Sequence, residues 1–179
     1  MDGNRHIVDQ KTLRQYKKKY NFFETPAKIA DKMASLLEGI GINAKILEPS
    51  AGLGALIKAV EKWCKFPQID FCEIQEVFYE KLTDYNHVGT DFMEYNPGSV
   101  YDAVIMNPPY KNGLAEKHVD HAWDCLKPGG RMVALVGRRA ADFIDDEFYG
   151  HVFYREEIKK GFRETSINTY LFLIHKPAV

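Results

Sequence analysis

The amino-acid sequence predicts a single α/β domain built on a mostly parallel β-sheet with helices on both faces. Strand-like and helix-like segments alternate along most of the chain, at a spacing typical of parallel strands joined by helical crossovers. The last two strand-like segments, 151–158 and 167–175, are separated by about eight residues. That is too few for a parallel crossover, so one of the two must run antiparallel. The length of 179 residues suits one domain with a full core.

The elements are expected in a regular order along the chain. The first helix lies within residues 22–41, with Thr25 as its N-cap, Pro26 at its first helical position and an apolar stripe at helical spacing. Strands are expected at 44–49, 68–74, 87–94 (with its exit loop), 101–107 and 129–136. Helices are expected within 50–64 (a glycine turn that runs into a helix), at 75–85 and at 114–126.

Composition excludes several classes of protein. Hydrophobic residues make up 45% of the chain and charged residues 27%, ordinary values for a globular protein. No apolar run approaches the roughly 20 residues that span a bilayer, and the first ten residues are too polar for a signal peptide. A cytoplasmic protein is therefore expected.

The three cysteines form no CxxC pair. His118, His121 and Cys125 could share a helix face, but no second cluster supplies further ligands, so no metal site is expected.

The net charge of −1 conceals an uneven distribution. Residues 1–20 carry six basic and two acidic side chains, and residues 151–179 carry five basic and three acidic ones. The segment between them is acidic. Basic ends around an acidic body are compatible with a polyanion that the ends grip, although a solvated helix face would have the same composition.

The turn after the first strand has the features of a ligand-binding loop. Gly52 and Gly54 in "EPSAGLG" have no side chains, so the backbone can approach a ligand closely. The third glycine of a dinucleotide fingerprint is replaced by Ile57, and no phosphate-binding P-loop follows. Glu48, just ahead of the glycines, would repel a diphosphate and attract a cation. The loop therefore favours a cationic ligand.

Two further carboxylates follow the next strands. Glu73 ends the second strand, where it can accept hydrogen bonds from ribose hydroxyls. Asp91 follows the third strand, where it can accept from an exocyclic amine, and Phe92 can pack on an adenine ring. Because the carboxyl ends of parallel strands share one edge of the sheet, these groups are expected to form one site. S-adenosylmethionine, with its ribose, adenine and cationic amino end, fits this set, and NAD fits it poorly.

Five motifs in order resemble one enzyme family. The segments "FFETP", "EPSAGLG", "FCEI", "TDFM" and "NPPY" are similar to those of the class I S-adenosylmethionine-dependent methyltransferases, and specifically of the N6-adenine DNA methyltransferases with the gamma order of motifs. The resemblance covers about residues 22–175. It implies a Rossmann-like, seven-stranded sheet with an antiparallel last strand, and S-adenosyl-L-methionine as the cofactor.

The resemblance also implies site residues and a domain organisation. Residues 1–21 would form a basic N-terminal arm, and 22–179 a single catalytic domain without a separate target-recognition domain. Glu48 would bind the amino group of the cofactor, Glu73 the ribose, and Asp91 with Phe92 the adenine. The implied cofactor residues are Phe23, Thr25 and Pro26 at the methionine end, then Glu48, Pro49, Ser50, Ala51, Gly52, Gly54, Glu73, Ile74, Asp91, Phe92 and Asn107.

The segment "NPPY" ends the fourth strand in a rigid turn, here called the elbow, whose residues suit a catalytic role in the methylation of an amine. The exocyclic amine of adenine is a poor nucleophile, because its lone pair is delocalised into the ring. The Asn107 side-chain carbonyl and the Pro108 backbone carbonyl can accept its two N–H bonds and expose the lone pair. Pro108 and Pro109 fix the backbone so that both carbonyls face one point. Tyr110 offers a flat ring for stacking on the base.

A base inside a duplex must be flipped out to reach this elbow. Phe162 occupies the place where the family packs an aromatic side chain on the extruded base, although a core position explains it equally well. Several basic side chains near the same loops could contact phosphate: Lys111, Arg138, Arg139, Lys159, Lys160 and Arg163.

The sequence leaves alternatives open. The same elbow also occurs in enzymes that methylate amines in RNA or the side-chain amide of a protein glutamine, and a non-catalytic nucleic-acid-binding subunit could retain the fold. With DNA as the partner, the missing target-recognition region predicts a short or degenerate site, or a specificity partner or homo-oligomer.

Overall fold

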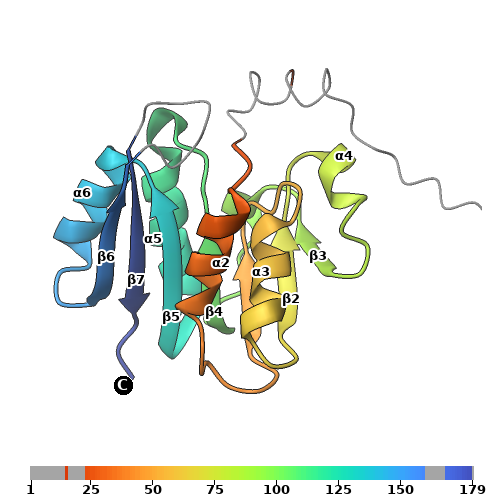
Figure 1. Ribbon diagram of the computed structural model, residues 1–179, viewed down its shortest axis with the longest axis horizontal. Helices are drawn as coiled ribbons and strands as arrows, with labels where there is room; N and C mark the ends of the chain where they lie inside the picture. The colour runs from red at the N-terminus through yellow and green to blue at the C-terminus, as the bar shows by residue number, and fades with distance from the viewer. Residues whose placement is uncertain (1–14, 16–22, 160–167, 179) are drawn as a thin grey trace, which may run out of the picture.

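The computed structural model describes residues 15, 23–159 and 168–178. They form a seven-stranded sheet with the order β3-β2-β1-β4-β5-β7-β6 (Figure 1). The strands are β1 Lys45–Glu48, β2 Gln68–Cys72, β3 Asn86–Gly89, β4 Tyr101–Met106, β5 Leu126–Val136, β6 Val152–Ile158 and β7 Thr169–His175. All pairings among β1 to β5 are parallel, whereas β7 runs antiparallel to both of its neighbours, β5 and β6. The predicted fold class is confirmed.

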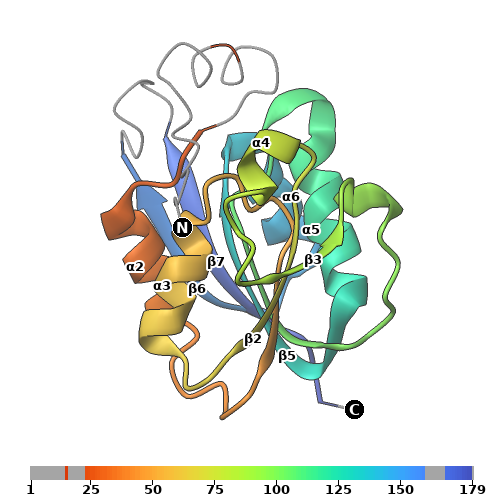
Figure 2. The same cartoon turned by 90° about the vertical axis from the view of Figure 1, so that its right-hand side faces the viewer.

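Helices cover both faces of the sheet (Figure 2). Helices α2 (Ala27–Ser35) and α3 (Ala55–Trp63) lie on one face, and α5 (Leu114–Cys125) and α6 (Arg138–Glu147) lie on the other. Each helix pair closes its own hydrophobic core cluster against the sheet. Two apolar layers of this kind are what a sheet with near-continuous hydrophobic strands requires.

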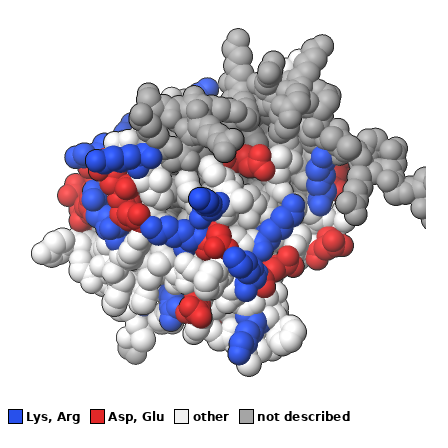
Figure 3. Space-filling view, viewed as in Figure 1, with Lys and Arg blue, Asp and Glu red and all other residues white. Residues whose placement is uncertain are grey.

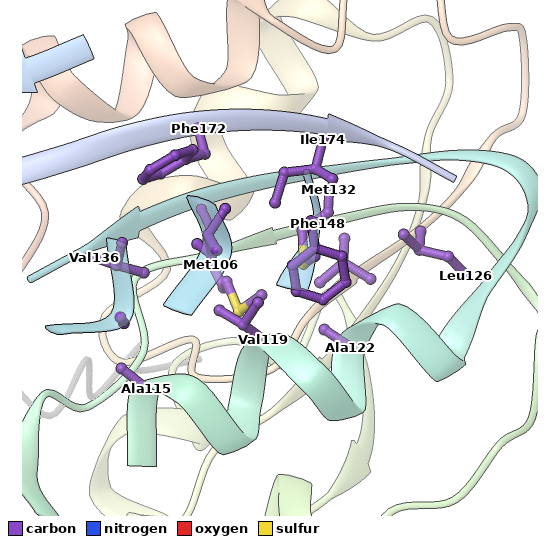
Figure 4. Close-up of a cluster of buried hydrophobic side chains, with 14 of the residues drawn as sticks. Met106, Ala115, Val119, Ala122, Leu126, Met132, Val136, Phe148, Phe172 and Ile174 are labelled. Carbon is purple, nitrogen blue, oxygen red and sulfur yellow. The ribbon is translucent and has the colours of Figure 1, made fainter. Parts of the chain in front are cut away.

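Helix α5 shows how the sequence pattern builds one of these layers (Figure 4). Its apolar positions Ala115, Val119 and Ala122 recur at helical spacing and are buried. They pack toward Met106 and Met132, which come from the parallel strands β4 and β5. Close packing on the sheet fixes where α5 begins, and so holds the loop between β4 and α5 in place.

Three helices differ from the sequence-based expectation. Helix α2 begins at Ala27 and ends at Ser35, and its N-cap is Pro26, with extended ψ, rather than Thr25. Helix α4 spans only Glu76–Tyr79, after which the chain continues through turns. Helix α6 was not predicted, and its buried residues are Ala140, Ala141 and Ile144. Six of its ten residues are charged, so the segment is polar on average even though its apolar positions recur at helical spacing.

The described surface carries mixed charge. In the view of Figure 3, Lys and Arg are interspersed with Asp and Glu over the described residues, with no field of a single sign. Lys32 pairs with Glu156, and Lys62 pairs with Asp31. Exposed ion pairs of this kind contribute little to stability.

The predicted basic arm lies outside the described residues, apart from Gln15. Phe162, Lys160 and Arg163 also lie outside them. Among the described helices, none is long and apolar enough to cross a membrane.

Candidate active site

A cavity of about 250 Å³ lies at the carboxyl-end edge of the sheet. Its walls come from the ends of β1, β2 and β4 and from the segment before α2. The sheet order reverses between β1 and β4, which is where open parallel sheets bind ligands. Most of the predicted site residues line this cavity: Phe23, Thr25, Glu48, Pro49, Ser50, Ala51, Glu73, Ile74, Asp91, Phe92, Asn107, Pro108, Pro109 and Tyr110.

Pro26, Gly52 and Gly54 are not among the lining residues. Pro26 caps α2, and Gly52 supports the site through its backbone N–H. Gly54 has a φ of +76°, and a Cβ there would lie 2.6 Å from Leu82 Cδ2. Its left-handed backbone and its packing against Leu82 therefore account for the glycine.

Glu73 is buried at the end of β2 and organises the glycine turn. Its Oε2 accepts a hydrogen bond of 2.7 Å from the Gly52 N–H, and its Oε1 accepts one of 2.9 Å from the Gln75 N–H. Burial raises the pKa of this carboxyl, and the backbone donors oppose that shift. Each carboxylate oxygen can accept a further bond, so Glu73 keeps acceptors for ligand hydroxyls.

Glu48 is the last residue of β1 and is only 2% exposed. Burial, followed by the neighbouring charge of Glu73, raises the pKa of its carboxyl well above the ordinary value, although a backbone hydrogen bond with Ile57 opposes the shift. Its Oε2 is buried without a hydrogen-bond partner among the described residues. A buried carboxyl oxygen without a partner is costly, and a cationic group beside it would remove that cost.

The adenine side of the predicted site combines a turn and an aromatic ring. Asp91 accepts a hydrogen bond of 2.9 Å from Met93 N–H, which begins the 3₁₀ turn Phe92–Glu94. The Phe92 ring is 2% exposed and lies 5.2 Å from the His118 ring and 4.7 Å from the His121 ring, between centroids. Phe92 therefore anchors the turn in the core as well as lining the cavity.

His118 was not predicted as a site residue, yet it lines the cavity from α5. Its Nδ1 lies 3.5 Å from Ser50 Oγ. Burial lowers its pKa to about 4, against the opposing effect of Asp91. The imidazole is therefore neutral near pH 7. The sequence offered one signal, the shared helix face with His121 and Cys125, and that signal did not indicate this cavity.

Asn107 follows β4 directly and is held at both ends of its amide. Its Nδ2 donates to Thr25 Oγ1 at 3.0 Å and to the Phe23 carbonyl oxygen at 3.3 Å. Its Oδ1 accepts a hydrogen bond of 2.8 Å from the Tyr110 hydroxyl. These contacts explain why Thr25 does not cap α2, because its hydroxyl oxygen accepts the hydrogen bond from Asn107, 82 residues away in the chain.

Tyr110 is tied to the elbow as well as lining the cavity. Besides Asn107 Oδ1, its hydroxyl lies 3.3 Å from the Leu135 carbonyl oxygen, and burial raises the pKa of the phenol. Its ring lies close to Gly137, where an added Cβ would be 3.9 Å from Cδ2 of Tyr110. The next turn is sharp, because Asn112 and Gly113 both have left-handed φ values, +54° and +75°. The elbow is thus fixed on both sides of its prolines.

Comparisons with known proteins bear on this arrangement. The chain is 32% identical over 120 residues to the Type II methyltransferase M.AccI of Acinetobacter calcoaceticus, a match that covers 59% of this chain and 22% of that relative. The chain thus matches about a fifth of the length of this relative. A solved structure from Pyrococcus horikoshii, an inferred RNA methyltransferase, superposes with a TM-score of 0.73 at 17% identity, over 88% of each chain.

A protein from Listeria monocytogenes (lmo1582), inferred to be a class I S-adenosylmethionine-dependent methyltransferase, superposes with a TM-score of 0.71 at 16% identity, over 94% of this chain and 68% of that one. This chain has the class I S-adenosylmethionine-dependent methyltransferase fold. The resemblance predicted from the motifs is confirmed at this level. No family model matches the chain.

The methyltransferase fold and the relatives imply S-adenosyl-L-methionine as the cofactor. The described residues fit this group. The cavity brings Glu48, with its unpartnered buried oxygen, together with Glu73. Two buried carboxyl groups with raised pKa values favour a ligand that carries positive charge. Asp91 and Phe92 lie in the same cavity, as a nucleoside with an exocyclic amine requires.

Proposed function

We propose that this chain transfers a methyl group from S-adenosyl-L-methionine to the exocyclic N6 amine of adenine in DNA, with the target base flipped out of the duplex. The observation that carries the proposal is the held amide of Asn107, which shares one cavity with the candidate cofactor residues Glu48 and Glu73. The sequence similarity to a Type II methyltransferase supports DNA as the substrate class.

In this proposal the bound cofactor supplies an electrophilic methyl group on a sulfonium. Asn107 Oδ1 and the Pro108 carbonyl accept the two N–H bonds of the target amine, which draws the nitrogen toward tetrahedral geometry. The amine nitrogen would take this methyl group, with the electron pair of the carbon–sulfur bond left on the sulfur, and would then lose a proton to water. The protein's contribution is alignment and electrostatic stabilisation, which the rigid elbow suits.

Asn107 Oδ1 has two acceptor positions, and the Tyr110 hydroxyl uses one of them. The second remains for the target amine. The same hydrogen bond orients the Tyr110 ring beside the elbow, where it can stack on a flipped base. Glu48 and Glu73 hold the amino and ribose ends of the cofactor in this scheme, and Asp91 with Phe92 holds its adenine.

The test is methyl transfer to defined acceptors. The purified full chain is incubated with methyl-labelled S-adenosylmethionine and duplex DNA, RNA or a glutamine-containing protein, and the products are digested and identified by mass spectrometry. We expect N6-methyladenine in DNA, lost in Asn107→Ala and kept in Asn96→Ala, an asparagine that does not line the cavity. Label that appears only in RNA or in glutamine, or cofactor binding without any transfer, would contradict the proposal and favour one of the alternatives.

A further inference from the structure

The segment before α2 and the end of β4 meet at one side-chain amide. Thr25 is 7% exposed, and its Oγ1 lies 3.0 Å from Asn107 Nδ2. Pro26, rather than Thr25, occupies the N-cap position of α2, and no side-chain hydrogen bond caps that helix. The hydroxyl of Thr25 is therefore directed to the elbow that follows β4 instead of to its own helix.

The orientation of the Asn107 amide follows from its partners. The Phe23 backbone carbonyl can only accept, so the end of the amide that faces it, 3.3 Å away, is the NH₂ group. Oδ1 is then the end that faces Tyr110. If the amide were rotated by half a turn, its NH₂ group would meet an N–H bond of an amine substrate, and the Pro108 carbonyl would be left as the single acceptor of the proposed pair. Chemistry at an amine therefore depends on which end of this amide is held.

We propose that Thr25 is a positioning residue, which holds Asn107 with its oxygen available to the target amine. This inference rests on the proposed function, because it assigns Thr25 a role through Asn107. It differs from the role implied by the family resemblance, in which Thr25 contacts the methionine end of the cofactor. A cofactor ligand would act on the affinity for the cofactor, whereas a positioning residue acts on turnover.

Two substitutions separate the hydroxyl from the shape of the side chain. Thr25→Val keeps the volume and removes the acceptor, and Thr25→Ser keeps the acceptor. Thr169→Val is the matched control, because Thr169 is fully buried and its hydroxyl has no hydrogen-bond partner among the described residues. The measurements are kcat and KM for DNA, the Kd for S-adenosylmethionine by calorimetry, and the ¹⁵N side-chain amide signals of Asn107, assigned by their absence in Asn107→Ala.

We expect kcat of Thr25→Val to fall about tenfold, as the loss of one hydrogen bond predicts, with KM for DNA and the cofactor Kd changed less than about twofold. Thr25→Ser should restore kcat, and Thr169→Val should leave it unchanged. The Asn107 amide signals should shift in Thr25→Val and return in Thr25→Ser. A weaker cofactor Kd with unchanged kcat in Thr25→Val would overturn the proposal and make Thr25 a cofactor ligand.

The amide signals also separate this inference from the proposed function. If the wild-type chain transfers no methyl group to adenine, the proposed function fails, and the contact between Thr25 and Asn107 is still read from the spectra. Asn107 signals that are identical in wild type and Thr25→Val would overturn the positioning role, whatever the activity. If Thr25→Val does not fold, a normal kcat in Thr25→Ser supports the role, and a kcat reduced tenfold in Thr25→Ser overturns it.

Discussion

Glu73 accepts the backbone N–H of Gly52 at 2.7 Å, which ties the end of β2 to the turn that follows β1. Two adjacent parallel strands thereby share one carboxylate at the edge where the cavity opens. The same carboxylate accepts the Gln75 N–H, so both of its oxygens hold backbone that lines or supports the cavity.

Replacing Glu73 should therefore weaken cofactor binding in two ways. Glu73→Ala removes the proposed ribose acceptor and the anchor of the glycine turn, and a hydrogen bond to a charged group contributes about 1.5–3 kcal/mol. We expect the Kd for S-adenosylmethionine to rise about 10- to 100-fold, measured by calorimetry. Glu80→Ala, an exposed carboxylate after α4, is the control and should leave the Kd unchanged. An unaltered Kd in Glu73→Ala would exclude this placement of the ribose.

The raised pKa of Glu48 predicts that stability falls as the pH rises. Because its pKa in the folded protein exceeds the unfolded value, the native state binds more protons between the two, and the free energy of unfolding decreases through that window. Glu48→Gln should remove this loss and raise the stability of the ligand-free protein at pH 8 by about 1–2 kcal/mol. Urea unfolding at pH 5 and pH 8 measures the difference, and an identical pH dependence in both proteins would contradict the assignment.

Cofactor binding should release a proton. A cationic amino group next to Glu48 favours the carboxylate, so the pKa of the carboxyl falls on binding and the affinity rises with pH through the raised pKa. Calorimetry between pH 5.5 and 7, in buffers that differ in ionisation enthalpy, measures the proton count. In Glu48→Gln most of the release should disappear. A count that is the same in both proteins would assign the released proton to another group.

The hydroxyl and the ring of Tyr110 should have separable effects. Tyr110→Phe removes the donor to Asn107 Oδ1 and keeps the ring, so we expect kcat for methyl transfer to fall about three- to tenfold. Tyr110→Ala also removes the proposed stacking surface, worth about 1–3 kcal/mol per base, and should lower kcat/KM for DNA further, by at least another tenfold. Equal kinetics of the two variants would exclude stacking by the ring.

Gly54 should be intolerant of a side chain. Gly54→Ala places a Cβ 2.6 Å from Leu82 Cδ2 on a backbone with φ +76°, and we expect a loss of about 1–3 kcal/mol in unfolding free energy. In the double variant Gly54→Ala/Leu82→Ala the clash is absent. Its loss of unfolding free energy, measured by denaturant titration, should therefore be smaller than the sum of the losses in the two single variants. Strict additivity would show that backbone conformation alone requires the glycine.

The parts of the site that lie at strand ends were predictable from the sequence. Glu48 is the last residue of β1, Glu73 and Asn107 directly follow β2 and β4, and the fold brings such strand ends to one edge. The partner of Thr25 was not predictable, since the local sequence Thr-Pro before an apolar stripe indicates a helix cap and carries no trace of a contact 82 residues away. His118 was not predicted as a site residue for a similar reason, because only the packing of α5 on the sheet directs its side chain into the cavity.

Helices α4 and α6 show where hydrophobic periodicity in the sequence fails to predict the bounds or the existence of a helix. The residues after Tyr79 favour a longer helix, but the chain turns there, with Leu82 packed over Gly54. Helix α6 has apolar residues at helical spacing, with Ile144 buried and Phe143 packed against the same core cluster. Six of its ten residues are charged, however, so the segment is polar on average and was not predicted as a helix.

The contact between Thr25 and Asn107 also has a consequence for biosynthesis. A ribosome adds about 5–20 residues per second, so Asn107 follows Thr25 by several seconds. During that interval the segment before α2 has been made, whereas its partner at the end of β4 does not yet exist. The elbow, the glycine turn and this segment therefore become a functional unit late, after most of the parallel sheet has been synthesised. Nascent chains that end before Asn107 should not retain S-adenosylmethionine.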